Sequence, residues 1–354
     1  MTETVVQDQS AVGDGSPSQD RGDLNVFELG GVVLQGGITL PDAKLAYKTY
    51  GQLNTARDNA ILMPTFFGGQ HADTELMLSP GRALDPSTFF VIVPDLFGDG
   101  LSSSPSNTPS PFDGPCFPHT TLYDNVTCQH RLVTEHFGID RLRLVVGFSM
   151  GAQQALQWGA LYPDMVDAIA PICGSAKTST QNRILLQGVK AALTTAVDFQ
   201  GGWYRTAPAK ALRAFVAVYC SLVACSEFYT DEEYTKLGLA SPEDVMRFFE
   251  GFFRQRDAND LLAKLQTWQH ADISANDIYK GNLEDALAAM PRAIVMPSRA
   301  DLLFPVVDSH REAKLMPDAE LRPIPSTWGH LAGFGANPAD NEFIDAALDE
   351  LLRG

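Results

Sequence analysis

The chain has 354 residues, a formal net charge of −17 at pH 7 and 45% hydrophobic residues. This length and apolar content suit one large globular domain, or two of ordinary size, with a sizeable buried core. A surface this negative repels phosphate backbones and anionic lipids, so we expect neither nucleic acid nor a membrane as a partner.

The first 23 residues are mostly small or polar, with almost no large apolar side chains. This composition predicts a disordered tail at 1–23, without the basic and apolar regions of a secretory signal. The five cysteines include no CxxC pair, which favours free thiols in a reducing compartment and a cytoplasmic protein. Cys173 follows an apolar run and is the thiol that could lie near a pocket.

Short apolar runs bounded by Gly or Pro alternate with helical patterns along the chain. Such runs are typical of strands buried on both faces of a parallel sheet. The predicted strands are 60–63, 89–93, 142–146, 168–173, 293–296 and 320–324. The predicted helices between them include 121–137, 150–162 and 305–315. The alternation indicates an α/β fold with right-handed crossovers and a mostly parallel central sheet.

Residues 177–290 interrupt this alternation, because they contain helical patterns and little strand signal. An insertion of this length is too long for a simple connection between two strands. We therefore predict a helical lid at 177–290, inserted into an α/β core formed by 24–176 and 291–354.

The segment Gly147-Phe148-Ser149-Met150-Gly151 matches the pattern GxSxG. The bare pattern is common, but here it follows a predicted strand and opens a predicted helix. That setting is the one required for a nucleophile elbow, in which the serine stands on a strained turn. The N–H groups at the start of the helix would face developing negative charge. The sequence thus predicts Ser149 as a catalytic nucleophile.

A serine nucleophile needs an adjacent base, and in this arrangement the acid and then the histidine follow it along the chain. His330 follows the last predicted strand and is the expected base. Asp301 follows the preceding strand and is the expected acid. Asp308 is the competitor, but it lies in the predicted helix 305–315, where it should share a solvated face with His310 and Glu312. The histidines expected to be structural or exposed are His119, His130, His136 and His270.

Acyl transfer also requires N–H donors for an oxyanion. The expected donors are the N–H of Met150, directly after the nucleophile, and that of Phe66, in the loop after the strand at 60–63. Phe67 is the alternative to Phe66, and both rings are expected to line a pocket. No HExxH pattern or metal-ligand spacing occurs, and no GxGxxG follows a strand. We expect no metal and no dinucleotide cofactor.

These residues resemble the homoserine O-acetyltransferase family of α/β hydrolases, from about Phe27 to the C-terminus. The resemblance is carried by 147–158, 162–164, 253–259 and 301–305. It implies an α/β-hydrolase fold, a helical lid forming a tunnel to the nucleophile, an acyl-serine intermediate and often a homodimer. The family's catalytic triad maps to Ser149, Asp301 and His330, and its oxyanion donors map to Phe66 and Met150.

Two positions depart from the family's pattern. Homoserine acetyltransferases carry an Asp for the substrate amine directly after the catalytic His, where this chain has Leu331. Their arginine for the substrate carboxylate falls on Val216 when the lids are aligned. With Phe67, Leu331 and Val216 are the predicted substrate-binding residues, and they place the chain in a side branch of the family.

The sequence therefore predicts a serine hydrolase, an esterase that cleaves an ester of a small and fairly apolar molecule. The alternative is an O-acyltransferase with acyl-CoA as co-substrate and an alcohol as acceptor. A more remote alternative is a catalytically inactive binding protein with a hydrolase fold. The partner in each case is a small molecule, and no cofactor is expected.

Overall fold

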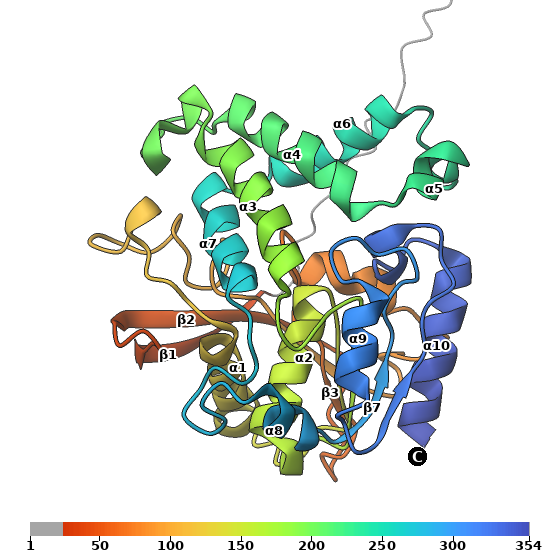
Figure 1. Cartoon of the computed structure of the whole chain (residues 1–354). Coiled ribbons are helices and arrows are strands. Elements are labelled where there is room, and N and C mark those ends of the chain that lie inside the picture. Colours follow the sequence, from red (N-terminus) through yellow and green to blue (C-terminus); the bar gives the residue numbers. More distant parts are fainter. Residues whose placement is uncertain (1–23, 354) are drawn as a thin grey trace, which may run out of the picture.

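The computed structural model describes residues 24–353 (Figure 1). The tail predicted at 1–23 lies outside these residues. Among the helices that the structure describes, none combines the length and the apolar character needed to cross a membrane.

Within the described residues, eight strands form one sheet in the order β1-β2-β4-β3-β5-β6-β7-β8. The strands are β1 (Asn25–Val33), β2 (Thr39–Tyr50), β3 (Ala60–Leu62), β4 (Phe90–Pro94), β5 (Leu144–Phe148), β6 (Ala168–Ile172), β7 (Arg292–Val295) and β8 (Ala319–Leu321). β2 pairs antiparallel with β1 and β4, and the remaining pairs are parallel. The mostly parallel sheet predicted from the sequence is confirmed. The sequence did not reveal β1 and β2, because glycines, charges and Pro41 interrupt their apolar pattern.

The sheet is covered on both faces, because its strand residues alternate between two clusters of buried side chains. Ile92 and Val145 pack on the face that also contains α1 and α2 residues. Their neighbours Val91 and Val146 point the other way, into the cluster completed by α10. The core helices are α1 (Leu122–Arg131), α2 (Met150–Leu161), α9 (Val306–Ala313) and α10 (Pro338–Arg353). The helix predicted at 121–137 continues beyond α1 as a π-helical turn, Leu132–His136.

The predicted lid contains helices and no strand of the sheet. Its elements are α3 (Thr180–Thr194), a 3₁₀ turn (Val197–Gly202), α4 (Ala209–Val223), α5 (Ser226–Thr230), a second 3₁₀ turn (Glu233–Leu237), α6 (Pro242–Phe253), α7 (Ala258–Gln269) and α8 (Leu283–Ala288). Figure 1 shows α3 to α7 together above the sheet. They have an apolar cluster of their own, which includes Phe215, Phe253 and Trp268.

The structure corrects the carboxyl-terminal boundary of this lid. Ile273, Leu287 and Met290 pack in the same cluster as the sheet and α2. In Figure 1, α8 lies at the end of the molecule far from α4 and α6. Residues 273–290 are therefore part of the core packing, because their apolar side chains cover the sheet rather than the lid helices.

A second correction concerns the face of α9 that was predicted to be solvated. His310 is exposed and Asp308 is half-buried, but Glu312 is buried. Both oxygens of the Glu312 carboxyl accept the N–H of Ala176, at 3.0 and 2.9 Å. Burial raises the pKa of Glu312 to about 8, and backbone hydrogen bonds partly oppose this shift.

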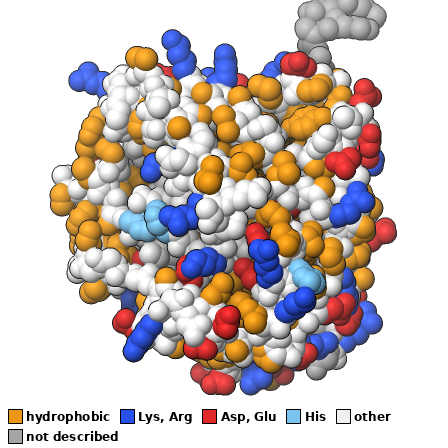
Figure 2. Space-filling view, in the orientation of Figure 1, with side chains coloured by type: hydrophobic (Ala, Val, Ile, Leu, Met, Phe, Trp, Pro, Cys, Tyr) orange, Lys and Arg blue, Asp and Glu red, His pale blue; other side chains and the backbone are white. Residues whose placement is uncertain are grey.

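Positively and negatively charged side chains lie scattered on the face of the molecule seen in Figure 2.

Candidate active site

Ser149 stands on a sharp turn between β5 and α2. Its backbone has φ 58° and ψ −120°, in the left-handed range of φ that is strained for a serine. The glycines on either side are required by close packing. A Cβ on Gly147 would lie 2.3 Å from the carbonyl carbon of Gly151, and one on Gly151 would lie 2.5 Å from the oxygen of Pro64. The predicted strand–turn–helix setting of Ser149 is present.

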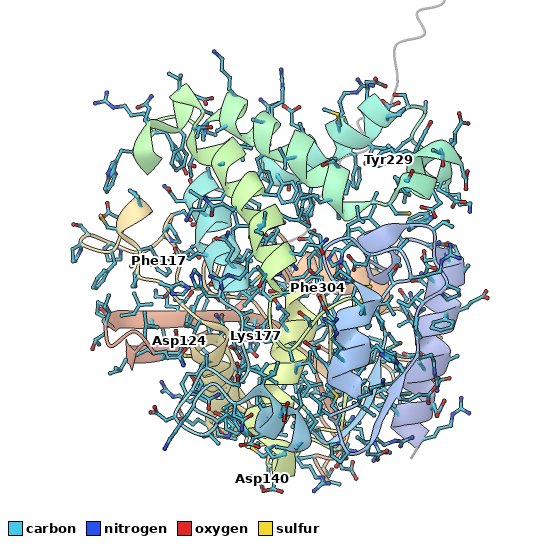
Figure 3. The ribbon with its side chains drawn as sticks, viewed as in Figure 1. Phe117, Asp124, Asp140, Lys177, Tyr229 and Phe304 are labelled. Atoms are coloured by element: carbon cyan, nitrogen blue, oxygen red, sulfur yellow. The ribbon has the colours of Figure 1, made fainter. Side chains whose placement is uncertain are left out.

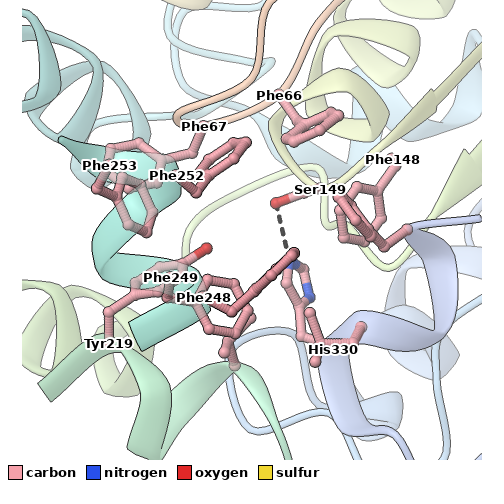
Figure 4. Close-up of a pocket in the computed structure, with 13 residues that line it drawn as sticks. Phe66, Phe67, Phe148, Ser149, Tyr219, Phe248, Phe249, Phe252, Phe253 and His330 are labelled. Carbon is pink, nitrogen blue, oxygen red and sulfur yellow. Dashed lines mark hydrogen bonds between the residues drawn. The ribbon is translucent and has the colours of Figure 1, made fainter. Parts of the chain in front are cut away.

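Ser149, His330 and Asp301 form a continuous hydrogen-bonded relay. Figure 4 shows its bond between Ser149 and His330. The distance from Ser149 Oγ to His330 Nε2 is 2.9 Å, and that from His330 Nδ1 to Asp301 Oδ2 is 2.7 Å. The other carboxylate oxygen of Asp301 accepts the N–H groups of Leu303 and Phe304, at 2.8 and 3.0 Å. All three relay residues are buried. A carboxylate on Nδ1 leaves Nε2 free to accept the serine proton.

Asp301 and His330 lie in loops that follow β7 and β8, the positions expected from the sequence. His330 lies in a 3₁₀ turn, Gly329–Gly333, that is pressed against the lid. A Cβ on Gly329 would lie 2.6 Å from the N of Cys225. The imidazole is flanked by the rings of Phe148 and Phe304, with centroids 4.8 and 5.4 Å away. Figure 3 shows Phe304 at the level where the lid meets the core.

Asp308 does not take part in this relay. Its carboxylate lies 3.7 Å from the Arg311 guanidinium on the same helix. The structure therefore brings Asp301, and not Asp308, to the histidine.

The predicted oxyanion donors lie on two adjacent segments. Met150 is the first residue of α2, so its N–H has no intrahelical acceptor. Phe66 follows β3, and its N–H makes no backbone hydrogen bond within residues 24–353. The close contact between Gly151 and Pro64 places the loop of Phe66 against the first turn of α2.

Two buried basic side chains of the lid, Lys264 and Arg256, hold this loop. The Nζ of Lys264 donates to the carbonyls of Phe66 and Gly69, at 3.3 and 3.2 Å. The Nε of Arg256 donates to the Gly68 carbonyl at 2.8 Å. Burial lowers the pKa of Lys264, whereas nearby buried carboxyls oppose that shift. Sequence reasoning missed both residues, although Arg256 lies in the lid segment that carried the family resemblance.

The same region contains a histidine that sequence reasoning did not assess. The Nδ1 of His71 lies 2.7 Å from Asp95 Oδ2, and its backbone N–H donates to Asp95 Oδ1 at 2.8 Å. Burial raises the pKa of Asp95 to about 7 and lowers that of His71. This pair lies beyond the loop and does not line the pocket.

Ser149 opens into a small pocket between the core and the lid, shown in Figure 4. Its lining is Phe66, Phe67, Phe148, Ser149, Tyr219, Val223, Phe248, Phe249, Phe252, Phe253, His330, Leu331 and Phe334. No Asp, Glu, Lys or Arg belongs to this lining. The cavity volume is about 30 Å³, whereas one water needs roughly 10–15 Å³. The pocket therefore suits small, uncharged groups.

The structure places two of the three predicted substrate-binding residues in this lining, namely Phe67 and Leu331. The third, Val216, is buried in the lid cluster and does not belong to this lining. Tyr219 and Val223, further along α4, take the places at the pocket. Val216 shares a face of α4 with Tyr219 and Val223, which follow it by three and seven positions, so the difference is one of position along the helix axis.

All five cysteines are unpaired. Cys173 is fully buried among side chains of the sheet and α10 and does not line the pocket. Burial raises the pKa of its thiol well above the usual value. In residues 24–353, no group of three or more His, Cys, Asp or Glu side chains could hold a metal ion.

Residues 61–335 match the family model described as the alpha/beta hydrolase fold. The ethyl acetate hydrolase of Pseudomonas veronii is 37% identical over 342 residues, covering 94% of this chain and 97% of that protein. A solved acetylester hydrolase from Corynebacterium glutamicum superposes with a TM-score of 0.91 at 36% identity, covering 94% of this chain and 97% of that one.

A homoserine O-acetyltransferase of Chlorobaculum parvum is 30% identical over 311 residues, covering 84% of this chain and 86% of that protein. The similarity to both esterases and an acetyltransferase agrees with the resemblance seen in the sequence. The chain belongs to the α/β-hydrolase family, in the branch that contains homoserine O-acetyltransferases and acetyl esterases.

Proposed function

We propose that this chain is a serine esterase that hydrolyses short-chain esters, acetate esters of small alcohols above all. The observation that carries the proposal is the buried relay from Asp301 through His330 to Ser149, which opens into an uncharged aromatic pocket. A binding protein would have no need for the complete relay.

In the proposed reaction, Ser149 Oγ attacks the acyl carbon while His330 Nε2 takes the hydroxyl proton. Asp301 holds the imidazole through Nδ1 and stabilises the cation that forms. The N–H groups of Phe66 and Met150 bind the tetrahedral oxyanion. The C–O bond to the alcohol then breaks, and His330 returns the proton to the departing alkoxide. Water repeats the sequence on the acyl-serine and releases the carboxylic acid.

The pocket supports the choice of substrate. Its aromatic and aliphatic walls and its volume of about 30 Å³ favour a short acyl group and a short alcohol. A zwitterion such as homoserine would bury two uncompensated charges there, at a cost of several kcal/mol for each ion. The relatives named for the hydrolysis of ethyl acetate and acetyl esters point to the same substrate class.

Acyl transfer from acyl-CoA to an alcohol is the second candidate, favoured by the similarity to a homoserine O-acetyltransferase. It uses the same relay and differs in what resolves the acyl-serine. Leu331 argues against homoserine as the acceptor, because it presents an apolar side chain beside His330.

A panel of p-nitrophenyl esters from acetyl to octanoyl, together with ethyl acetate, tests the proposal. We expect kcat/KM to be highest for acetyl esters and to fall as the acyl chain lengthens. The same assay with added alcohols and with acetyl-CoA plus L-homoserine separates hydrolysis from transfer. A kcat/KM for homoserine acetylation of about 10⁴ M⁻¹s⁻¹ or more, the lower end for competent enzymes, would refute esterase as the main activity.

A further inference from the structure

A chain of buried side-chain amides runs beneath the nucleophile elbow. The indole N–H of Trp158 donates to Gln129 Oε1 at 2.9 Å, and Gln129 Nε2 donates to Gln154 Oε1 at 2.6 Å. Gln154 Nε2 then donates to the backbone carbonyl of Thr65 at 2.9 Å. Trp158, Gln129 and Gln154 are all 0% exposed. Polar groups buried this completely must be satisfied by protein partners, so the chain fixes each of its members.

The direction of this chain is set by its first member. An indole nitrogen can only donate, so Gln129 must turn its oxygen toward Trp158 and its NH₂ toward Gln154. Gln154 must then accept through its oxygen and present its own NH₂ to Thr65. A core tryptophan thereby determines which way the Gln154 amide faces.

The Thr65 carbonyl belongs to the same peptide unit as the Phe66 N–H. In a planar trans peptide these two groups point in opposite directions, so a donor that holds the carbonyl also sets the aim of the N–H. Gln154 Nε2 lies 3.2 Å from the Met150 carbonyl as well. One buried amide therefore joins the loop of Phe66 to the first turn of α2, which carries the second oxyanion donor.

We propose that Gln154 is a positioning residue of the oxyanion hole, oriented by Trp158 through Gln129. It does not touch the substrate. It holds the Thr65–Phe66 peptide so that the Phe66 N–H is directed at the oxyanion before the reaction begins. This inference rests on the proposed esterase function, because only acyl transfer at Ser149 produces that oxyanion.

The same helix supplies a matched control, Gln157. It is 1% exposed, and its Nε2 donates to the carbonyl of Ile273 at 3.3 Å, away from the loop of Phe66. Gln154→Met and Gln157→Met each replace a buried amide by an apolar side chain of similar length. Both should lower the thermal midpoint of unfolding, but only Gln154→Met should disturb the oxyanion hole.

The test compares the two variants in acetate ester turnover and in binding of a trifluoromethyl ketone, which forms a tetrahedral adduct with the serine. For Gln154→Met we expect kcat to fall at least about tenfold, with a ceiling near the 10²–10³-fold loss that follows removal of an oxyanion donor. KM should change by less than about threefold, and the inhibition constant of the ketone should rise in proportion to the loss of kcat/KM. Gln157→Met should leave these quantities within about threefold of the wild type.

Equal kinetic effects of the two variants, or a loss confined to KM, would overturn the inference while leaving the esterase proposal intact. An inactive wild type would instead overturn the proposed function. If Gln154→Met does not fold, Trp158→Phe replaces it in the test, because it removes the donor that orients the chain of amides. In this variant too, the inhibition constant of the ketone should rise in proportion to the loss of kcat/KM. A change in ketone binding that does not follow kcat/KM in this variant would also overturn the inference.

Discussion

The core and the lid contribute different things to the same pocket. The loops of the core supply every member of the relay, Ser149, Asp301 and His330. The lid supplies apolar walls such as Tyr219 and Phe253. The relay therefore comes from the core alone, whereas the pocket walls come from both parts, so lid changes should alter substrate preference more than the labelling of the nucleophile. Lys264 and Arg256 are exceptions, because they extend from the lid to backbone carbonyls of the core.

The largest effect is expected in the core, for Ser149→Ala. Without the nucleophile, ester turnover should fall by about 10⁶-fold, the scale of the loss in other serine hydrolases. A serine-directed fluorophosphonate should add one label to the wild type and none to the variant, as measured by intact mass. Labelling of the alanine variant would show that another residue is the nucleophile.

The next effect concerns the acid. Asp301→Asn should reduce kcat by roughly 10³–10⁴-fold, because an amide no longer holds His330 in the required tautomer. Asp308→Asn is the control, since Asp308 lies on α9 beside Arg311 and outside the relay. Steady-state kinetics of both variants decides the matter, and a milder loss for Asp301→Asn than for Asp308→Asn would assign the acid to Asp308.

A smaller effect is expected where the lid meets the oxyanion loop. Lys264→Met should lower kcat/KM by about tenfold to a hundredfold, because two loop carbonyls lose their donor and the loop loosens. This loss is smaller than the loss that follows complete removal of an oxyanion donor. The control is Lys177→Met, whose ammonium forms a half-exposed ion pair with Asp272 at 2.7 Å and should matter little. If the two variants have the same activity, Lys264 of the lid does not influence the chemistry, and the lid contributes only walls to the pocket.

Much of the site could be predicted because its signals are local in the sequence. The glycines beside Ser149 mark a strained turn, and the positions of Asp301 and His330 follow from the order of the strands. The sheet could also be predicted where its strands are continuous apolar runs. The strands β1 and β2, at one end of the sheet, could not, because their solvent-exposed positions permit polar residues and glycines.

The residues that support the site could not be predicted, because their partners are distant in the chain. Lys264 lies 198 positions from Phe66 and Glu312 lies 136 from Ala176. Gln154 is one of three similar glutamines on α2, and only the fold shows which of them meets the loop. The lid alignment placed Val216 on α4, the helix that does reach the pocket, but not on the turn of that helix that lines it.

Leu331→Asp tests the assignment of selectivity to the pocket walls, with a more modest effect on activity. A carboxylate at this position would be buried against aromatic rings, so kcat/KM for acetate esters should fall about tenfold or more, by at least the 1.4 kcal/mol that this factor represents. Leu331→Met is the volume-matched control and should remain within about threefold of the wild type. Unchanged ester kinetics in Leu331→Asp would mean that residue 331 does not contact the substrate.

The smallest effect is expected at the junction where the chain leaves the core for the lid. There the buried Glu312 accepts the N–H of Ala176, and burial raises its pKa from 4.5 to about 8. Between these pH values the folded state binds more protons than the unfolded state. The stability that this group contributes is therefore complete below about pH 4.5 and is lost as the pH rises through about 8, at no more than ~1.4 kcal/mol per pH unit.

Urea midpoints at pH 5.5, 6.5, 7.5 and 8.5 should fall more steeply for the wild type than for Glu312→Gln, which cannot titrate. Glu320→Gln is the control, because Glu320 is exposed, pairs with Arg322 and has a lowered pKa. Parallel profiles for the wild type and Glu312→Gln would show that Glu312 does not titrate in this range, and that the junction of lid and core is insensitive to pH.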